Sequence, residues 1–165
     1  MEHARASQDG SHDFDFILGR WNIHNRWLRE ILAGSGEWYE FEASSGARPL
    51  LDGAANEDEF RTDHAGGCIG MSFRFYDPET GQWSIYWVAT RHPGRLDPPG
   101  VGAFDRNVGV FEGEDVFRGS PIRMRFIWSG VTTSTPRWEQ SFSDDAGVTW
   151  ETNWVMEFAP AGDGR

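Results

Sequence analysis

The stretch at residues 138–158, WEQSFSDDAGVTWETNWVMEF, alternates apolar with polar side chains on both sides of one turn. Successive side chains of a β-strand point to opposite faces, so this period of two predicts two antiparallel strands. Asp145 and Gly147 suit the tight turn between them, because Asp bonds nearby backbone and Gly tolerates a positive φ. The stretch therefore predicts a β-hairpin.

The turn itself, SDDAGVTW at residues 143–150, resembles the Asp-box of sialidases and related propellers. A propeller uses four strands per blade and repeats its motif from blade to blade. This pattern occurs once in a chain of 165 residues. Length and copy number exclude a sialidase propeller, so the motif is interpreted as a hairpin turn.

The same alternation recurs in WYEFEAS, CIGMSFRFY, QWSIYWVAT and PIRMRFIWS, and no segment sustains a long helical period. One short helical turn is expected at Phe14, Ile17 and Leu18, with Ser11 or Asp13 as its cap. Residues 91–105, RHPGRLDPPGVGAFD, are rich in Pro and Gly and are expected to form a long loop at the mouth. About nine strands at regular spacing favour an all-β sandwich or a closed barrel.

Our preferred interpretation is a single antiparallel up-and-down barrel of about 8–10 strands. Its core would span residues 12–158. We expect residues 1–11, which are polar and patternless, to be disordered, and residues 159–165 to form a flexible tail.

Aromatic content is high for a polar chain, with 9 Trp, 12 Phe and 3 Tyr. One face of each late strand is apolar, and the opposite face is rich in Arg and Glu, which predicts cross-strand ion pairs in solvent. So much aromatic surface exceeds what a plain core of this size needs. We therefore expect some of it to line a cavity.

Gly19, Arg20 and Trp21 form a Gly-x-Trp motif that enters the first predicted strand after the helical turn. Together with LLDGAANEDEF, DPETGQWSIYW and WEQSFSDDAGVTWETNW, the motif resembles a family of uncharacterised bacterial lipocalin-like (calycin) proteins. The resemblance covers roughly residues 12–158. It implies a barrel whose signature Trp closes the bottom, and it implies no particular activity.

The chain is acidic, with 26 Asp and Glu against 15 Lys and Arg and a net charge of -11. This charge disfavours nucleic acids and anionic membranes as partners. The N-terminal stretch lacks the apolar middle of a signal peptide, so we expect a cytoplasmic protein. The single cysteine, Cys68, excludes an internal disulfide and a multi-Cys metal site.

No cofactor or metal is expected. A heme-binding barrel such as nitrobindin also carries Gly-x-Trp, but its iron ligand is a late His, and the five His here lie at 3, 12, 24, 64 and 92. They lack the paired spacing of a metal motif. His24 and His92 are acid or base candidates only if they reach the lumen, and otherwise are surface residues.

The sequence thus favours binding of a small apolar, aromatic or ring-containing molecule in the lumen. The predicted ligand-binding residues are Asn25, Trp27, Trp87, Phe126, Trp128, Trp138, Gln140, Thr152 and Trp154. An enzyme of the same fold, a cyclase, isomerase or hydratase, is the alternative, with Arg125, Glu139 and Asn153 as its site if strand parity is reversed. A homodimeric interaction module using an outer sheet face is the third class.

Overall fold

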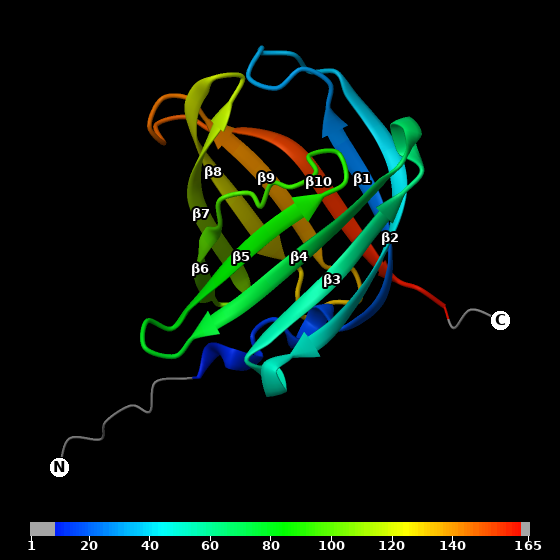
Figure 1. Cartoon of the computed structure of the whole chain (residues 1–165), viewed down its shortest axis with the longest axis vertical. Helices are drawn as coiled ribbons and strands as arrows, with labels where there is room; N and C mark the ends of the chain where they lie inside the picture. The colour runs from blue at the N-terminus through cyan, green and yellow to red at the C-terminus, as the bar shows by residue number, and fades with distance from the viewer. Residues whose placement is uncertain (1–8, 163–165) are drawn as a thin grey trace.

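A computed structural model describes residues 9–162, which form an all-β barrel of ten antiparallel strands (Figure 1). The strands are β1 (Gly19–Leu28), β2 (Trp38–Leu50), β3 (Ala55–Thr62), β4 (Cys68–Asp77), β5 (Gln82–Ala89), β6 (Gly100–Asp105), β7 (Val108–Phe117), β8 (Ser120–Ser129), β9 (Arg137–Ser143) and β10 (Glu151–Pro160). Each strand pairs with its neighbour in sequence, and β1 pairs with β10 to close the ring. The predicted up-and-down barrel is confirmed.

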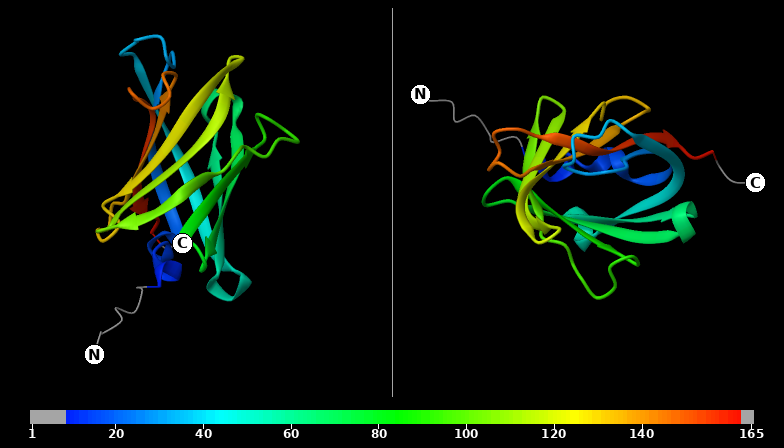
Figure 2. Two further views of the ribbon diagram at one scale, coloured as in Figure 1. Left: turned by 90° about the vertical axis from the view of Figure 1, so that its left-hand side faces the viewer. Right: turned by 90° about the horizontal axis from the view of Figure 1, so that it is seen from above.

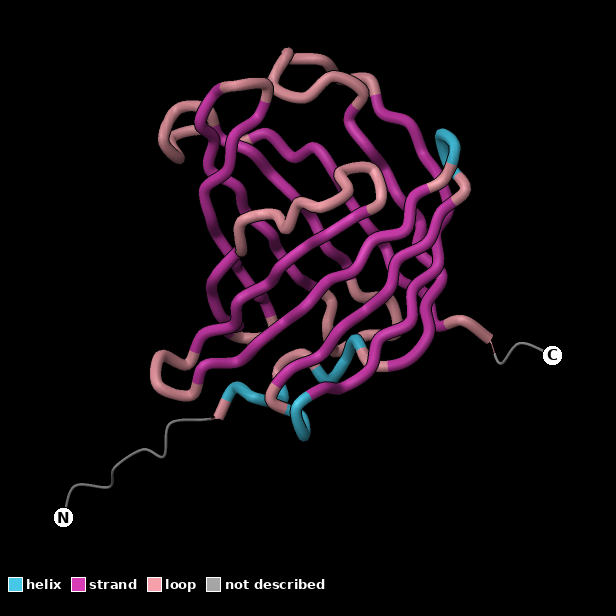
Figure 3. Tube along the Cα trace, in the orientation of Figure 1, coloured by secondary structure: helices cyan, strands magenta, loops and turns pink. Residues whose placement is uncertain are grey.

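Four short 3-10 turns complete the secondary structure (Figure 3): η1 (Gly10–His12), η2 (Asp15–Ile17), η3 (Leu51–Gly53) and η4 (His64–Gly66). The expected N-terminal helical turn is therefore present, as η1 and η2. The predicted cap was wrong, because η2 has Phe14 at its N-cap and no side-chain cap, whereas η1 is capped by Asp9, which accepts from the Ser11 amide. No helix among residues 9–162 has the length and apolarity needed to span a membrane.

The N-terminal segment closes one end of the barrel (Figures 1 and 2). Phe14 and Ile17 are fully buried there, and Phe14 packs edge-on against Trp83. Two indoles tie the segment to the wall: Trp83 Nε1 donates to the Gly10 carbonyl at 3.1 Å, and Trp21 Nε1 donates to the Ile17 carbonyl at 2.7 Å. The Trp of the Gly-x-Trp motif therefore lies at the closed end.

The expectation of one long loop over residues 91–105 was wrong in its second half, where Gly100–Asp105 forms β6. Gly100 and Gly102 act here as close-packing positions rather than as breaks. A side chain at Gly102 would come within 1.9 Å of the Val110 carbonyl oxygen on β7, so only glycine permits this approach. The loop that remains, residues 90–99, follows β5 at the open end.

The predicted terminal segments fall largely outside the described residues, which exclude 1–8 and 163–165. Within the described part, Gly10 and Ser11 belong to η1. At the other end, Ala159 and Pro160 belong to β10. The expectation of disorder at 1–11 therefore does not hold for these η1 residues, and residues 159–160 are part of the barrel rather than a tail.

The outer wall carries the predicted cross-strand ion pairs. Arg137 on β9 bridges Glu157 on β10 and Glu139 on its own strand, at 2.9 Å each. Arg125 on β8 pairs with Glu112 on β7 at 2.7 Å. Such solvent-accessible pairs contribute about 0–1 kcal/mol each to the free energy of unfolding. They therefore mark the solvent-facing side of the wall and add little to the stability of the barrel.

The β9–β10 turn is organised by Asp145. Its carboxylate accepts from the Thr149 hydroxyl at 2.5 Å, from the Thr149 amide at 2.8 Å and from the Ser143 hydroxyl at 2.7 Å. These hydrogen bonds, those from Thr149 first, lower the pKa of Asp145 to about 2. Gly147 has a φ of 88°, as the turn requires. The Asp-box pattern is thus a self-contained turn held by one carboxylate.

Replacing Asp145 with Asn should lower the melting temperature at pH 6, because an amide cannot accept all of these hydrogen bonds with both of its polar atoms. A carboxyl whose folded pKa is about 2, against 3.8 ordinarily, stabilises the fold above about pH 4 and loses that contribution as the pH falls toward 2. The difference between the two proteins should shrink over the same interval. Thermal unfolding followed by circular dichroism measures it.

Asp144→Asn is the matched control, since Asp144 is the exposed neighbour in the same turn. It should leave the melting temperature unchanged at both pH values. A pH-independent loss in Asp145→Asn would show that the carboxylate charge is not what stabilises the turn.

Candidate functional site: the barrel lumen

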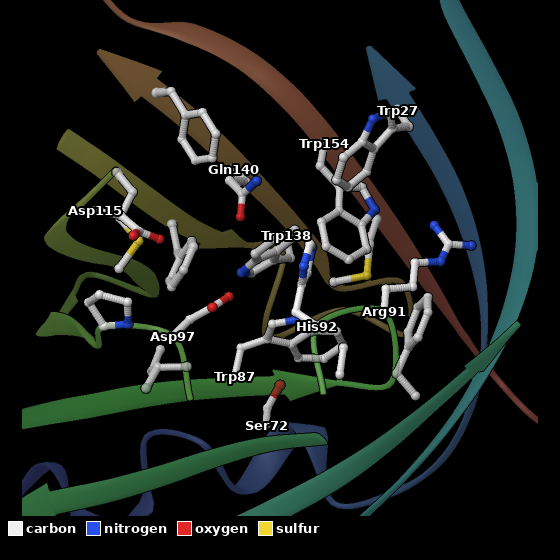
Figure 4. Close-up of a pocket in the computed structure, with 18 of the residues that line it drawn as sticks. Trp27, Ser72, Trp87, Arg91, His92, Asp97, Asp115, Trp138, Gln140 and Trp154 are labelled. Atoms are coloured by element: carbon white, nitrogen blue, oxygen red, sulfur yellow. The ribbon is translucent and has the colours of Figure 1, made fainter. Parts of the chain in front are cut away.

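The barrel encloses a cavity of about 470 Å³ between the plugged end and the open end (Figure 4). Its walls come from the inward faces of strands around the ring, and its mouth is bordered by the loop after β5. The view from above in Figure 2 shows a flattened ring of strands. The alternation read from the sequence therefore places aromatic side chains around a hollow interior.

Most of the predicted ligand-binding residues meet in this cavity: Trp27, Trp87, Phe126, Trp128, Trp138, Gln140 and Trp154. They come from β1, β5, β8, β9 and β10, so the barrel brings together residues far apart in sequence. Their role in binding stays a prediction. Asn25 and Thr152 do not line the cavity.

Asn25 lies behind the aromatic wall and is fully buried. Its Oδ1 accepts from Trp154 Nε1 at 2.9 Å, and its Nδ2 donates to the Ile23 carbonyl at 3.1 Å. With both polar atoms in use, Asn25 orients the indole of Trp154 rather than facing the lumen.

Thr152 was expected on the lumen face but lies on the outer one. The pairing of β9 with β10 shifts between Thr152 and Trp154, so Asn153 is an extra residue, a β-bulge. Trp154 pairs with Gln140 on the inside, whereas Thr152 pairs with Ser141 and their hydroxyls lie 3.0 Å apart. Because of the bulge, residues of β10 before Asn153 face the opposite side from the one that strict alternation predicts.

The residues proposed for the alternative enzyme site do not meet in the lumen. Arg125 and Glu139 lie on the outer face, since each flanks cavity-lining residues of its own strand, and both form ion pairs there. Asn153 is fully buried in the wall. His24 also lies outside, where a 2.5 Å hydrogen bond with Glu42 raises its pKa. Of the two histidines considered, only His92 reaches the cavity, at its mouth.

Trp154 is the centre of the aromatic wall. Its ring meets Trp138 and Trp87 edge to face, with centroids 5.2 and 6.2 Å away and interplanar angles of 88° and 81°. Trp27 packs against it from β1 at 4.8 Å. Edge-to-face contacts are a favoured geometry for aromatic pairs, so these rings brace one another.

Trp87 owes its position to Gly70, its neighbour on β4. A Cβ at residue 70 would come within 2.0 Å of the Trp87 ring. Trp87 is paired with Ser72 and Gly70 with Ala89, so the indole lies diagonally over a residue without a side chain. Because Gly70 faces inward, the space that a side chain would fill is occupied by this ring.

A charged pair lies at the deep end of the cavity, where the sequence reasoning placed none. Arg74 Nη2 donates to Asp58 at 2.5 Å and Nη1 donates to Asn56 at 2.9 Å, and the two charged residues are 4% and 7% exposed. The guanidinium also lies 5.3 Å from the Phe14 ring. A signal was present in the sequence, since Arg74 shares the inward parity of Gly70 and Ser72 on β4.

The mouth carries a second polar group. Arg95 pairs with Asp115 on β7 at 2.8 Å and with Asp97 at 3.3 Å, and the Asp97 amide donates to the Trp87 carbonyl at 2.9 Å. Partial burial raises the pKa of Asp97, opposed by Arg95 and reinforced by Asp115. These contacts hold the loop after β5 against the mouth. Among residues 9–162 no group of three or more His, Cys, Asp or Glu is placed to hold a metal.

Asp58→Ala should destabilise the barrel by about 3–5 kcal/mol, because it leaves the Arg74 charge buried without its partner. Urea unfolding followed by Trp fluorescence gives the free energy of unfolding. The double variant Asp58→Leu with Arg74→Met removes both charges and should recover most of the loss. A single variant as stable as the wild type would show that the pair is not sealed from water.

Comparison with known proteins adds no functional assignment: no family model and no curated protein matches this chain. The closed ten-strand antiparallel barrel is consistent with a lipocalin-like fold.

Proposed function

We propose that the protein binds a small apolar molecule, aromatic or otherwise ring-containing, in the barrel lumen. The observation that carries the proposal is a cavity of about 470 Å³ lined by aromatic side chains inside a barrel plugged at one end. Protein interiors are otherwise close-packed, and ligand sites typically measure about 300–1,000 Å³. A hollow of this size supports a binding role over a purely structural one.

The wall suits a planar ring. Trp87, Trp138 and Trp154 offer both faces and edges, and burying apolar surface contributes roughly 25 cal/mol per Å². Their mutual contacts and the Asn25 hydrogen bond hold the rings in place before a ligand arrives. Preorganisation of this kind lowers the entropic cost of binding.

The same proposal includes membership in the lipocalin-like (calycin) family of uncharacterised bacterial proteins. The Gly-x-Trp motif supports it, since Trp21 lies at the plugged end of a closed barrel. We also place the protein in the cytoplasm, which its single free thiol, Cys68, supports.

Filling the lumen should abolish binding. Ser72 on β4 lines the cavity, and Ser72→Phe should weaken binding of the neutral fluorescent probe N-phenyl-1-naphthylamine by about tenfold or more, because the added ring takes the ligand's space. Fluorescence titration of the probe measures the affinity.

The matched control is Ser84→Phe, on the outer face of β5, where Ser84 pairs with the exposed residues Phe75 and Val101. It adds the same ring outside the lumen and should leave binding unchanged. No binding by the wild type, or equal binding by both variants, would refute the lumen as the site. Mass spectrometry of the recovered probe separates binding from catalysis, since an enzyme would return it chemically altered.

A second candidate role, homodimer formation, is favoured by the outer wall. Four apolar side chains of this wall are 37–41% exposed: Phe75 on β4, Val101 on β6, and Val108 and Val110 on β7. An exposed apolar group on the outer wall fits a second copy of the same face.

If this face pairs, Val101→Lys should convert a dimer to a monomer in analytical ultracentrifugation, because it places a charge in the middle of the contact. Ser44→Lys, an exposed position on β2, is the control and should leave the dimer intact. A monomeric wild type at high concentration would rule out the dimer.

A further inference from the structure

Gln140 presents an oriented hydrogen-bond acceptor to the cavity. Its Nε2 donates to Asn153 Oδ1 at 2.9 Å, and Asn153 is fully buried at the β10 bulge. Because the amide nitrogen is used in the wall, the oxygen Oε1 is left for the lumen. Figure 4 shows this oxygen directed into the cavity.

Trp138 places a donor beside that acceptor. It lies two residues before Gln140 on β9, so both side chains share the inward face. Its indole N–H has no hydrogen-bond partner within residues 9–162, in contrast to Trp154, whose N–H is taken by Asn25. The nitrogen is not sealed off either, since the fully buried unpartnered nitrogens of the described chain are Arg74 Nε and Asn153 Nδ2.

Asp97 adds a carboxylate to the same part of the cavity. Figure 4 shows its side chain reaching inward from the mouth, toward the side on which Trp138 and Gln140 lie. The side chain is 33% exposed and shares Arg95 with Asp115. Arg95 offsets its charge, and its oxygens can still accept a hydrogen bond from a ligand in this part of the cavity.

These three side chains offer one donor next to two acceptors. A plain hydrocarbon would leave the Trp138 N–H and the Gln140 oxygen unpaired once water is displaced. A carboxylate would face the Gln140 oxygen and the Asp97 charge, and an ether would satisfy only the indole. A hydroxyl on an aromatic ring both donates to an acceptor and accepts from an N–H.

We infer that the lumen selects neutral aromatic molecules bearing a ring hydroxyl, recognised by Gln140 Oε1 and the Trp138 N–H with the ring held between the cavity's indoles. The inference rests on the proposed lumen binding and names its substrate class. Gln140 and Trp138 are then the specificity-determining residues. Asn153 is a positioning residue, since it orients the Gln140 amide.

The test uses three probes of one ring system with the full-length protein: 2-naphthol, 2-methoxynaphthalene and 2-naphthoate, measured by isothermal titration calorimetry at pH 7. The methoxy compound keeps the oxygen and loses the donor, and the naphthoate carries a charge. We expect 2-naphthol to bind about tenfold or more tightly than either, because a site built for a hydroxyl rejects analogues without it.

Gln140→Met keeps the length of the side chain and removes the acceptor, so it should lower the affinity for 2-naphthol to that for 2-methoxynaphthalene and leave the latter unchanged. Trp138→Phe, which keeps a ring and removes the N–H, should weaken the binding of 2-naphthol and 2-methoxynaphthalene alike, because the oxygen of either probe accepts from the indole. Circular dichroism and melting temperature check that both variants fold, and either one suffices for the test. Ser141→Ala, directly after Gln140 and on the outer face of β9, is the control and should keep the wild-type preference.

Equal affinity of the wild type for 2-naphthol and 2-methoxynaphthalene, with both lost in Ser72→Phe, would overturn the inference and leave lumen binding standing. A full hydroxyl preference in Gln140→Met would overturn the assignment to Gln140, and unchanged affinity for both 2-naphthol and 2-methoxynaphthalene in Trp138→Phe would overturn the assignment to Trp138. No binding of any of the three probes would refute the proposed function, and the inference with it.

Discussion

The pairing of β1 with β10 is the interaction on which the rest of the structure depends. It joins the two ends of the sheet through a continuous register from Trp21 opposite Pro160 to Trp27 opposite Trp154. Closure pairs the first strand with the last and gives every strand an inner face. It also brings Trp27 and Asn25 beside Trp154, so the wall of the cavity is assembled by the same contact that closes the barrel.

The two ends of the barrel differ, because one is filled by side chains and the other is open. At one end the N-terminal segment inserts Phe14 and Ile17, and Arg74 with Asp58 fills the space above them. At the other end the mouth is bordered by polar side chains around Arg95. An interior filled from one side only leaves a hollow that communicates with solvent in one direction.

The alternation of apolar and polar residues explains how much of the fold and of the cavity could be predicted from the sequence. On β8 and β9 the inward faces follow the pattern without exception, so Phe126, Trp138 and Gln140 were placed together. Prediction failed at Thr152 because a single extra residue, Asn153, reverses the parity, and a bulge has no period by which to detect it. The buried charge of Arg74 was missed for another reason: its partner Asp58 lies on another strand, and only the folded register brings them together.

Gly70 has a consequence for how such a pocket changes over evolution. The Trp87 ring rests on the bare backbone of residue 70, so a methyl group added there has to displace the ring, although residue 70 is not one of the side chains that surround the hollow. The shape of the cavity therefore depends partly on the missing side chain at residue 70. A single substitution at residue 70 would therefore change the shape of the cavity while every residue that lines it stays the same.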